Sequence, residues 1–171
     1  SPTLNGLNIS MRNITVSTCG VVPRIYDLMN LNLQLTLTIS LHAPNDEIRS
    51  NTMPINNKYK IDELLAACRK YGEKTGRRVS FEYTLIKDVN DSKENALELA
   101  TRLKGMNAHV NLIPVNDVKE RGNIKSSKKA ILNFQNILKK NGINATIRRT
   151  LGADINASCG QLRRLKNRGE N

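Results

Sequence analysis

The sequence has 171 residues and carries 27 Lys+Arg against 15 Asp+Glu, a formal net charge of +12. This length fits one domain with a sizeable core. No apolar run is long enough to span a membrane, and the first residues do not form a signal peptide. The charge is uneven, because residues 1–118 have a net charge of +2 and residues 119–171 one of +10. A one-sided positive field favours a polyanionic partner such as RNA, and a merely soluble basic surface is the alternative.

The three cysteines lie at positions 19, 68 and 159, too far apart for a disulfide framework or a C-x-x-C metal site. They indicate a reducing compartment, and we expect a cytoplasmic protein. We expect Cys19 and Cys68 to be small core residues. The chain begins at Ser1, without Met, and leads directly into a strand pattern, so we expect a fragment or a processed chain.

Hydrophobic periodicity, helix caps and turn residues predict strands that alternate with helices. The predicted strands are 13–17, 33–41, 79–86, 109–114 and 145–149, and the predicted helices are 23–30, 61–74, 92–104 and 126–140. This alternation predicts the α/β class with a mainly parallel sheet. The strands are too few to close an eight-stranded barrel, which takes roughly 250 residues. A piece of a barrel and an open sheet are both compatible with the pattern.

Ligands of parallel α/β folds bind at the carboxyl ends of the strands. These ends supply hydroxyl, amide and imidazole groups, notably Ser17, Ser40, His42 and Asn116. Such a set suits a polar small molecule better than acid–base hydrolysis. Each residue also has a simpler interpretation, because Ser17 could cap a turn and His42 could be an ordinary loop histidine. The sequence contains neither a G-x-G-x-x-G motif after a strand nor a Walker-type phosphate loop.

The aromatic residues are two Phe and four Tyr, with no Trp, which is a poor stacking platform for bases. We therefore expect RNA contacts to be made mainly to phosphates. The residues expected to make them are Lys119, Arg121, Arg148, Arg149, Arg163 and Arg164.

The polar segment from Ala153 to Leu162 contains a lone cysteine, Cys159, followed by Gly160. An accessible thiol beside a glycine suits a nucleophile or a covalent carrier. A tight turn with an incidental cysteine is the alternative.

Taken together, the chain resembles the RlmN group of radical-SAM RNA methyltransferases, which methylate carbon 2 of an adenine in 23S ribosomal RNA and in some tRNAs. The sister group Cfr, which methylates carbon 8 of the same adenine, shares much of the pattern. The matching stretches are VSTCGVVP (16–23), ISLHAPND (39–46), IRSNTMPIN (48–56), EYTLIKDVNDS (82–92), NLIPVN (111–116) and ADINASCGQL (153–162).

The resemblance implies that S-adenosylmethionine is bound by Ser17, Ser40, Leu41, His42 and Asn116. It also implies that Cys159 carries the methyl group, and that the full-length enzyme holds a 4Fe–4S cluster and uses an electron donor. The resemblance further implies that a carbon radical on the methylated cysteine adds to the base, because an adenine ring carbon is not nucleophilic enough to attack a methyl sulfonium.

The chain also departs from the family pattern. The C-x-x-x-C-x-x-C cluster motif and the Gly-Glu cofactor contact are absent, and Ser158 stands where the family usually has Ala. We therefore expect residues 1–150 to be the C-terminal part of a (β/α)6-type radical-SAM barrel, and residues 151–171 to be the carrier-cysteine loop and a basic tail. Alone, the chain is expected to hold no metal cluster and to be inactive. The remaining alternatives are a basic α/β domain that binds RNA without catalysis, and an ordinary α/β domain with a solvated tail.

Overall fold

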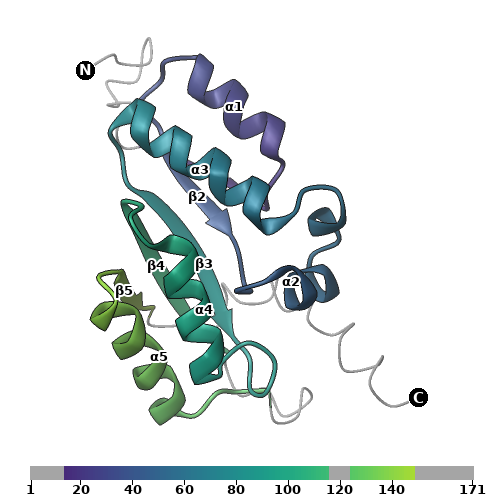
Figure 1. Cartoon of the computed structure of the whole chain (residues 1–171), viewed down its shortest axis with the longest axis vertical. Helices are drawn as coiled ribbons and strands as arrows, with labels where there is room; N and C mark the ends of the chain where they lie inside the picture. The colour runs from purple at the N-terminus through teal and green to yellow at the C-terminus, as the bar shows by residue number, and fades with distance from the viewer. Residues whose placement is uncertain (1–13, 116–123, 149–171) are drawn as a thin grey trace.

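The computed structural model describes residues 14–115 and 124–148. Strands and helices alternate along the chain (Figure 1). The strands are β1 (Thr15–Thr18), β2 (Thr36–Ser40), β3 (Val79–Leu85), β4 (Ala108–Pro114) and β5 (Asn144–Ile147). The helices are α1 (Val22–Asn30), α2 (Asp46–Thr52), α3 (Ile61–Thr75), α4 (Lys93–Leu103) and α5 (Lys128–Lys140), with a short 3-10 helix, η2 (Pro54–Asn57), after α2.

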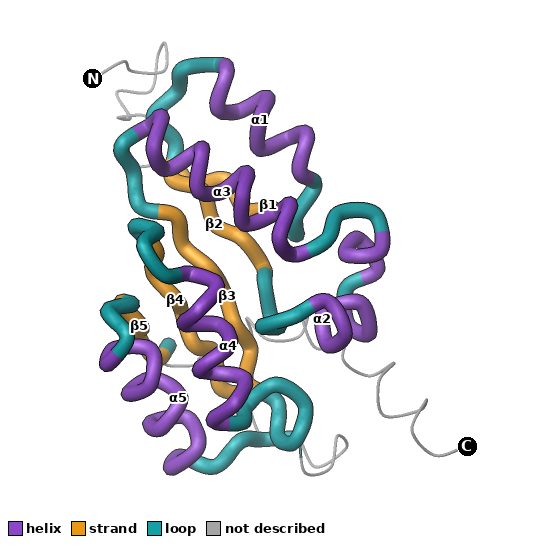
Figure 2. Tube along the Cα trace, in the orientation of Figure 1, coloured by secondary structure: helices purple, strands orange, loops and turns teal. Residues whose placement is uncertain are grey.

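The strands form a single five-stranded sheet in the order β1-β2-β3-β4-β5, and every neighbouring pair is parallel. Each connection therefore moves one position along the sheet in the same direction. Because such crossovers are right-handed, the connecting helices fall on the same face, and α1, α3, α4 and α5 lie in front of the strands in Figures 1 and 2. The predicted α/β class with a parallel sheet is confirmed, and this arrangement is that of a barrel wall.

The hydrophobic core fills the space between the sheet and these helices. Its fully buried residues include Leu37 and Ile39 of β2, Phe81 of β3, Val110 of β4 and Leu64 of α3. The rings of Tyr83 and Phe134 pack with their centroids 5.0 Å apart, which joins β3 to α5. Burial of apolar surface in this one layer is the main term that stabilises the fold.

Local signals define the helix ends. Ser92 begins α4 with a capping box, in which its hydroxyl accepts a hydrogen bond from Asn95 N and its own N–H donates to the Asn95 side chain. Ser127 caps α5 in the same manner, by accepting from Ala130 N. Helix α3 ends at Gly76, whose φ of +68° is the left-handed conformation that glycine adopts without strain.

The opposite face of the sheet is polar, although parallel sheets usually bury both faces under apolar side chains. Alternate residues of β3 and β4 are only half-buried here, and they are Ser80, Glu82, His109 and Asn111. The register aligns them with polar residues of the flanking strands, because Ser40 pairs with Glu82 and Asn111 with Thr146. No described helix covers this polar face (Figure 2).

Sequence-based bounds agree with the structure to within three residues for each predicted strand and helix in the described ranges. Helix α2 and η2 were not predicted. In addition, Cys68 is buried as expected, but the expectation for Cys19 is wrong, because Cys19 is exposed at the end of β1. In the described part of the chain, no helix combines the length and the apolarity needed to cross a membrane.

Candidate functional site at the carboxyl ends of the first two strands

Four of the residues implied to bind the cofactor come together at the carboxyl ends of β1 and β2. Ser17 is exposed on β1 and pairs with Thr38 of β2, two residues before Ser40. Ser40 is half-buried at the end of β2, Leu41 is fully buried and His42 is half-buried. Ser17 and Ser40 have the strand parity of the polar face, so their hydroxyls line that face. The fifth residue, Asn116, lies outside the described residues.

His42 has a left-handed backbone conformation, with φ of +57°, which is uncommon for a residue with a side chain. Its backbone is fixed on both sides. The N–H groups of Leu41 and His42 both donate to the Glu82 carbonyl, at 3.0 and 3.2 Å, and the His42 carbonyl accepts from Asn90 Nδ2 at 2.9 Å. Strained residues held by several hydrogen bonds in this way are concentrated at functional sites.

The imidazole of His42 is neutral and has one defined tautomer. Thr84 N donates to Nδ1 at 2.9 Å, so Nδ1 accepts and Nε2 carries the proton. Burial, together with the positive charge of Arg49, lowers the pKa of His42 from 6.5 to about 4. At neutral pH the residue therefore offers one N–H donor and no positive charge.

Helix α2 places a buried arginine directly behind these strand ends. Asn45 caps the helix by accepting from Ile48 N at 2.9 Å, and Arg49, one turn later, is fully buried. Its guanidinium donates to the carbonyls of Cys19, Ser40 and Leu41. Sequence reasoning missed both the helix and the arginine. The signal was present, since Asn45 followed by Asp46 and Glu47 is typical of a helix start.

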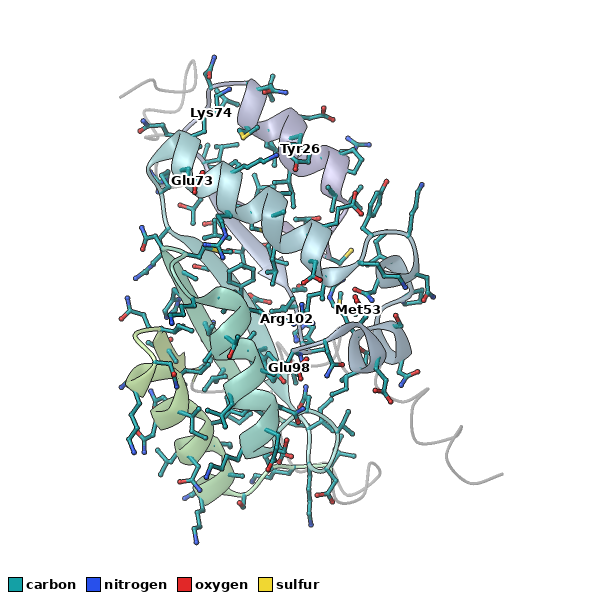
Figure 3. The ribbon with its side chains drawn as sticks, viewed as in Figure 1. Tyr26, Met53, Glu73, Lys74, Glu98 and Arg102 are labelled. Carbon is teal, nitrogen blue, oxygen red and sulfur yellow. The ribbon has the colours of Figure 1, made fainter. Side chains whose placement is uncertain are left out.

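Helix α4 supports the start of α2 from the side. Asn45 Nδ2 donates to Glu98 Oε2 at 3.2 Å. Glu98 Oε1 lies 3.7 Å from Arg102 Nη2, and the same arginine forms an ion pair with Asp62 of α3. Figure 3 shows Glu98 and Arg102 together on α4, beside α3 and α2. The cap of α2 is therefore connected to two core helices.

A second feature of the same edge is a cavity of about 690 Å³ between the β3–α4 connection and the start of α5. Its lining includes Lys87, Lys93 and Lys125, together with Asp88 and Asp91. The Asp91 carboxylate is engaged, because it accepts from Ser126 Oγ and from Asp88 N. The three lysines are exposed and form no ion pair within residues 14–115 and 124–148. The cavity thus presents positive charge at the carboxyl edge of the sheet.

Most residues expected to contact RNA lie outside the described residues, namely Lys119, Arg121, Arg149, Arg163 and Arg164. The carrier cysteine, Cys159, also lies outside them. Arg148 is described and exposed, and its N–H donates to the Leu112 carbonyl at 2.8 Å, which continues the pairing of β5 with β4.

The described residues do not fit an iron–sulfur cluster. Within them, no group of three His, Cys, Asp or Glu side chains could hold a metal ion. Of the two described cysteines, Cys19 is exposed and Cys68 is buried in the core. A three-thiolate cluster site is therefore not provided by this part of the chain.

A parallel α/β sheet with one helix-covered face, one polar face and hydroxyl and imidazole groups at its strand ends defines a domain that binds a polar cofactor. The radical SAM superfamily profile matches residues 4–100. The chain belongs to the radical SAM superfamily, whose members in general use S-adenosylmethionine and a 4Fe–4S cluster.

Individual relatives agree with the resemblance seen in the sequence. The chain is 62% identical over 160 residues to a probable dual-specificity RNA methyltransferase RlmN of Alkaliphilus oremlandii, covering 94% of this chain and 47% of the relative. It is 60% identical over 158 residues to a protein of the same name from Lachnospira eligens, covering 92% of this chain and 45% of the relative. The resemblance to the RlmN group is thus confirmed, and the chain spans about half the length of these curated relatives.

Solved structures give the same result for the fold. A radical SAM methyltransferase from Sphaerobacter thermophilus aligns with a TM-score of 0.83 and 51% identity, over 91% of this chain and 46% of that one. A domain of a pyruvate-formate lyase-activating enzyme from Bacteroides vulgatus aligns with a TM-score of 0.62 and 21% identity, over 79% of this chain and 80% of that one. At that identity the second match supports the fold alone.

Proposed function

We propose that the full-length protein methylates carbon 2 of an adenine in 23S ribosomal RNA and in tRNA, and that this chain supplies the cofactor-binding strand ends and the methyl-carrying cysteine. The observation that carries the proposal is the clustering of Ser17, Ser40, Leu41 and His42 at one edge of a polar sheet face. The relatives named RNA methyltransferases support the reaction class, and their RlmN name favours carbon 2 over the carbon 8 of the Cfr group.

The described donors match the chemistry of S-adenosylmethionine. The cofactor presents a carboxylate, ribose hydroxyls and ring nitrogens, all of which accept hydrogen bonds. Ser17 and Ser40 offer hydroxyls, and His42 offers Nε2–H. Asn116, which follows β4, would add an amide at the same edge. When bound, S-adenosylmethionine supplies the methyl group and, after one-electron reduction by an external donor, the radical that activates it.

Cys159 would act as the covalent carrier between cofactor and base. Its thiol would lose a proton, and the resulting thiolate would attack the methyl carbon of S-adenosylmethionine. The new carbon–sulfur bond would form as the bond from that carbon to the sulfonium sulfur breaks, and S-adenosylhomocysteine would leave. Ser158 and Gly160 flank it, and small neighbours leave the sulfur accessible. The three cysteines of this chain, at positions 19, 68 and 159, do not have the spacing of the cluster motif.

The lysines of the 690 Å³ cavity would hold the RNA backbone near this edge, together with Lys119, Arg121, Arg148, Arg149, Arg163 and Arg164. Phosphate contacts position a nucleic acid without reading its sequence. An RNA that delivers a base to the polar face from the carboxyl edge would pass beside this cavity.

The carrier role is tested in the full-length protein by replacing Cys159 with Ala. We expect loss of RNA methylation, measured by mass spectrometry of digested RNA against 2-methyladenosine and 8-methyladenosine standards. Ser158→Ala is the matched control and should remain active. Persistence of 2-methyladenosine in the Cys159→Ala reaction would refute the carrier role, and 8-methyladenosine as the wild-type product would refute the carbon 2 assignment. A folded wild-type protein that binds RNA without methylating it would favour the binding-domain alternative.

The RNA surface is tested by replacing Lys87, Lys93 and Lys125 together with Gln. Each phosphate contact contributes about −0.7 to the slope of log K against log salt for a single strand, so the slope should flatten by about 2. The matched control removes Lys74, Lys104 and Lys140 at the C-terminal ends of α3, α4 and α5, with the same change in charge. Equal slopes for both triple variants would place the RNA elsewhere.

A further inference from the structure

Arg49 is the one charged residue that is fully buried in the described part of the chain. Burying a charge is costly unless the charge is paired or fully hydrogen-bonded. Within residues 14–115 and 124–148, Arg49 forms no ion pair. Burial lowers its pKa, although Asp46 acts in the opposite direction. A buried arginine without an ion pair therefore needs another explanation, which its hydrogen bonds provide.

The guanidinium of Arg49 donates four hydrogen bonds, three of them to main-chain oxygens. Its Nε donates to Leu41 O at 3.2 Å, and one terminal nitrogen donates to Cys19 O at 2.5 Å and to Ser40 O at 3.1 Å. The other terminal nitrogen donates to Asn56 Oδ1 at 3.2 Å. The three carbonyls belong to the carboxyl ends of two adjacent parallel strands, β1 and β2. One planar group therefore joins both strand ends.

Two of the three carbonyls belong to residues that the resemblance implies to bind the cofactor. Ser40 and Leu41 are held directly by Arg49 through their own carbonyls, and His42 is the next residue. The left-handed φ of +57° at His42 requires the preceding backbone to be fixed. Without the guanidinium, the three carbonyls would lose this donor, and the turn at 40–42 would relax.

The surroundings of Arg49 are built to fit its planar shape. A Cβ atom placed on Gly20 would lie 3.0 Å from the guanidinium nitrogen, and Gly20 has a φ of +111°. On the far side, Asn56 is held by its own Nδ2, which donates to Asp46 Oδ1 at 3.0 Å and to Ser50 Oγ at 2.9 Å. Lysine carries its donors on a single nitrogen and cannot reach acceptors arranged around a fork.

We propose that Arg49 is the positioning residue of the S-adenosylmethionine site, where it fixes the carboxyl ends of β1 and β2 so that Ser40, Leu41 and His42 hold their binding geometry. The inference rests on the proposed cofactor site, and Arg49 acts through these residues rather than on the ligand. The same positive charge opposes protonation of His42, which keeps the imidazole in the neutral form that the site uses.

The test measures cofactor binding by itself, without RNA and without turnover. Full-length, cluster-containing protein is dialysed anaerobically against radiolabelled S-adenosylmethionine, and the Kd is compared for wild type, Arg49→Lys and Arg49→Gln. We expect the Kd to rise at least tenfold in both variants, while the Kd for RNA stays within twofold. Arg69→Gln, which removes an arginine of α3 whose guanidinium donates to Lys104 O at 3.3 Å, is the control and should leave both values unchanged.

A merely structural role for Arg49 predicts a different result, namely less folded protein but an unaltered Kd in the fraction that folds. A folded Arg49→Lys protein with a Kd within twofold of wild type would overturn the proposal. If neither variant folds, Asn56→Ser gives the answer, because it removes one acceptor and leaves the arginine in place. We expect a threefold rise in its Kd for S-adenosylmethionine, and an unchanged value would equally overturn the proposal.

Chemical rescue provides a further criterion. In Arg49→Gly, added guanidinium should restore part of the affinity for the cofactor. Methylammonium at the same concentration should not, because only guanidinium reproduces the forked arrangement of donors. Equal effects of the two cations would count against the proposal.

The outcomes also separate the two hypotheses. A wild-type protein that binds S-adenosylmethionine but methylates no adenine refutes the proposed function alone, whereas an unchanged Kd in Arg49→Lys refutes the role of Arg49 alone.

Discussion

Replacement of His42 by Asn should make the fold less sensitive to acid. In the native state His42 Nδ1 accepts from Thr84 N, and the pKa of His42 is lowered to about 4 by burial and by Arg49. In the unfolded chain His42 has its ordinary pKa of 6.5. Between about pH 6.5 and 4 the unfolded chain therefore binds a proton at His42 that the folded chain does not bind. The stability contributed by neutral His42 is therefore present above about pH 6.5 and is lost as the pH falls towards 4.

The size of the effect follows from the difference between the two pKa values. The gap from 6.5 to about 4 corresponds to about 3 kcal/mol of unfolding free energy, since one pKa unit is about 1.4 kcal/mol. About 2 kcal/mol of it should already be lost at pH 5. Asn is a suitable replacement because its side-chain oxygen can accept a hydrogen bond, and because Asn tolerates a left-handed φ better than most residues.

Urea denaturation of the 171-residue chain and of His42→Asn, at pH values from 7.5 to 4.5, measures the difference. His109 also has a pKa lowered by burial and by Arg78, so His109→Gln is the matched control for a second titrating imidazole. We expect the wild type to lose about 2 kcal/mol more than His42→Asn between pH 7.5 and 5. Parallel pH dependence of the two proteins, or a His42 pKa near 6.5 in an NMR titration, would refute the reasoning.

Two further expectations concern the core. Iodoacetamide at pH 8 should label Cys19, which is exposed. Cys68 should react only after unfolding, because burial raises the pKa of its thiol to about 12. Mass spectrometry of the digested chain reports both reactions, and labelling of Cys68 before unfolding would contradict its burial in the core. Tyr83→Phe removes the buried hydrogen bond from its hydroxyl to Asn90 O at 2.6 Å and should lower the free energy of unfolding by about 1–2 kcal/mol. The hydroxyl of Tyr59 forms no such bond with any residue that the structure describes, so Tyr59→Phe should change the free energy of unfolding little. Equal effects of the two substitutions in urea denaturation would argue against this role.

Most of the fold could be predicted from the sequence because its local signals agree with its tertiary structure. The helix 61–74 follows from apolar spacing and Gly76, and the start of α4 follows from Ser92, whose capping box Asn95 completes. Helix α2 was missed because it spans seven residues with little apolar periodicity. Its cap signal at Asn45 is local, but one contact of Arg49 is with the Cys19 carbonyl, 30 residues away, and no local window contains that contact.

The candidate site was predictable in part for a similar reason. The strand ends could be located from periodicity, so Ser17, Ser40 and His42 could be placed at one edge before the register was known. The polar face could not, because it depends on which residues of β3 and β4 align with those of β2 and β5. Cys19 illustrates the limit of composition, because its residue type favours burial but its position at the end of β1 exposes it.

The sequential order of the strands has a consequence for how the chain can acquire its structure during synthesis. Among the described residues, each strand pairs with strands that are its neighbours along the chain, so no strand of this sheet requires a partner that is synthesised much later. Each newly emerging strand and helix can therefore dock on an edge that already exists, from the N-terminal side onwards. The growing edge is always a single strand, and its exposure to other nascent chains ends as soon as the next strand has emerged.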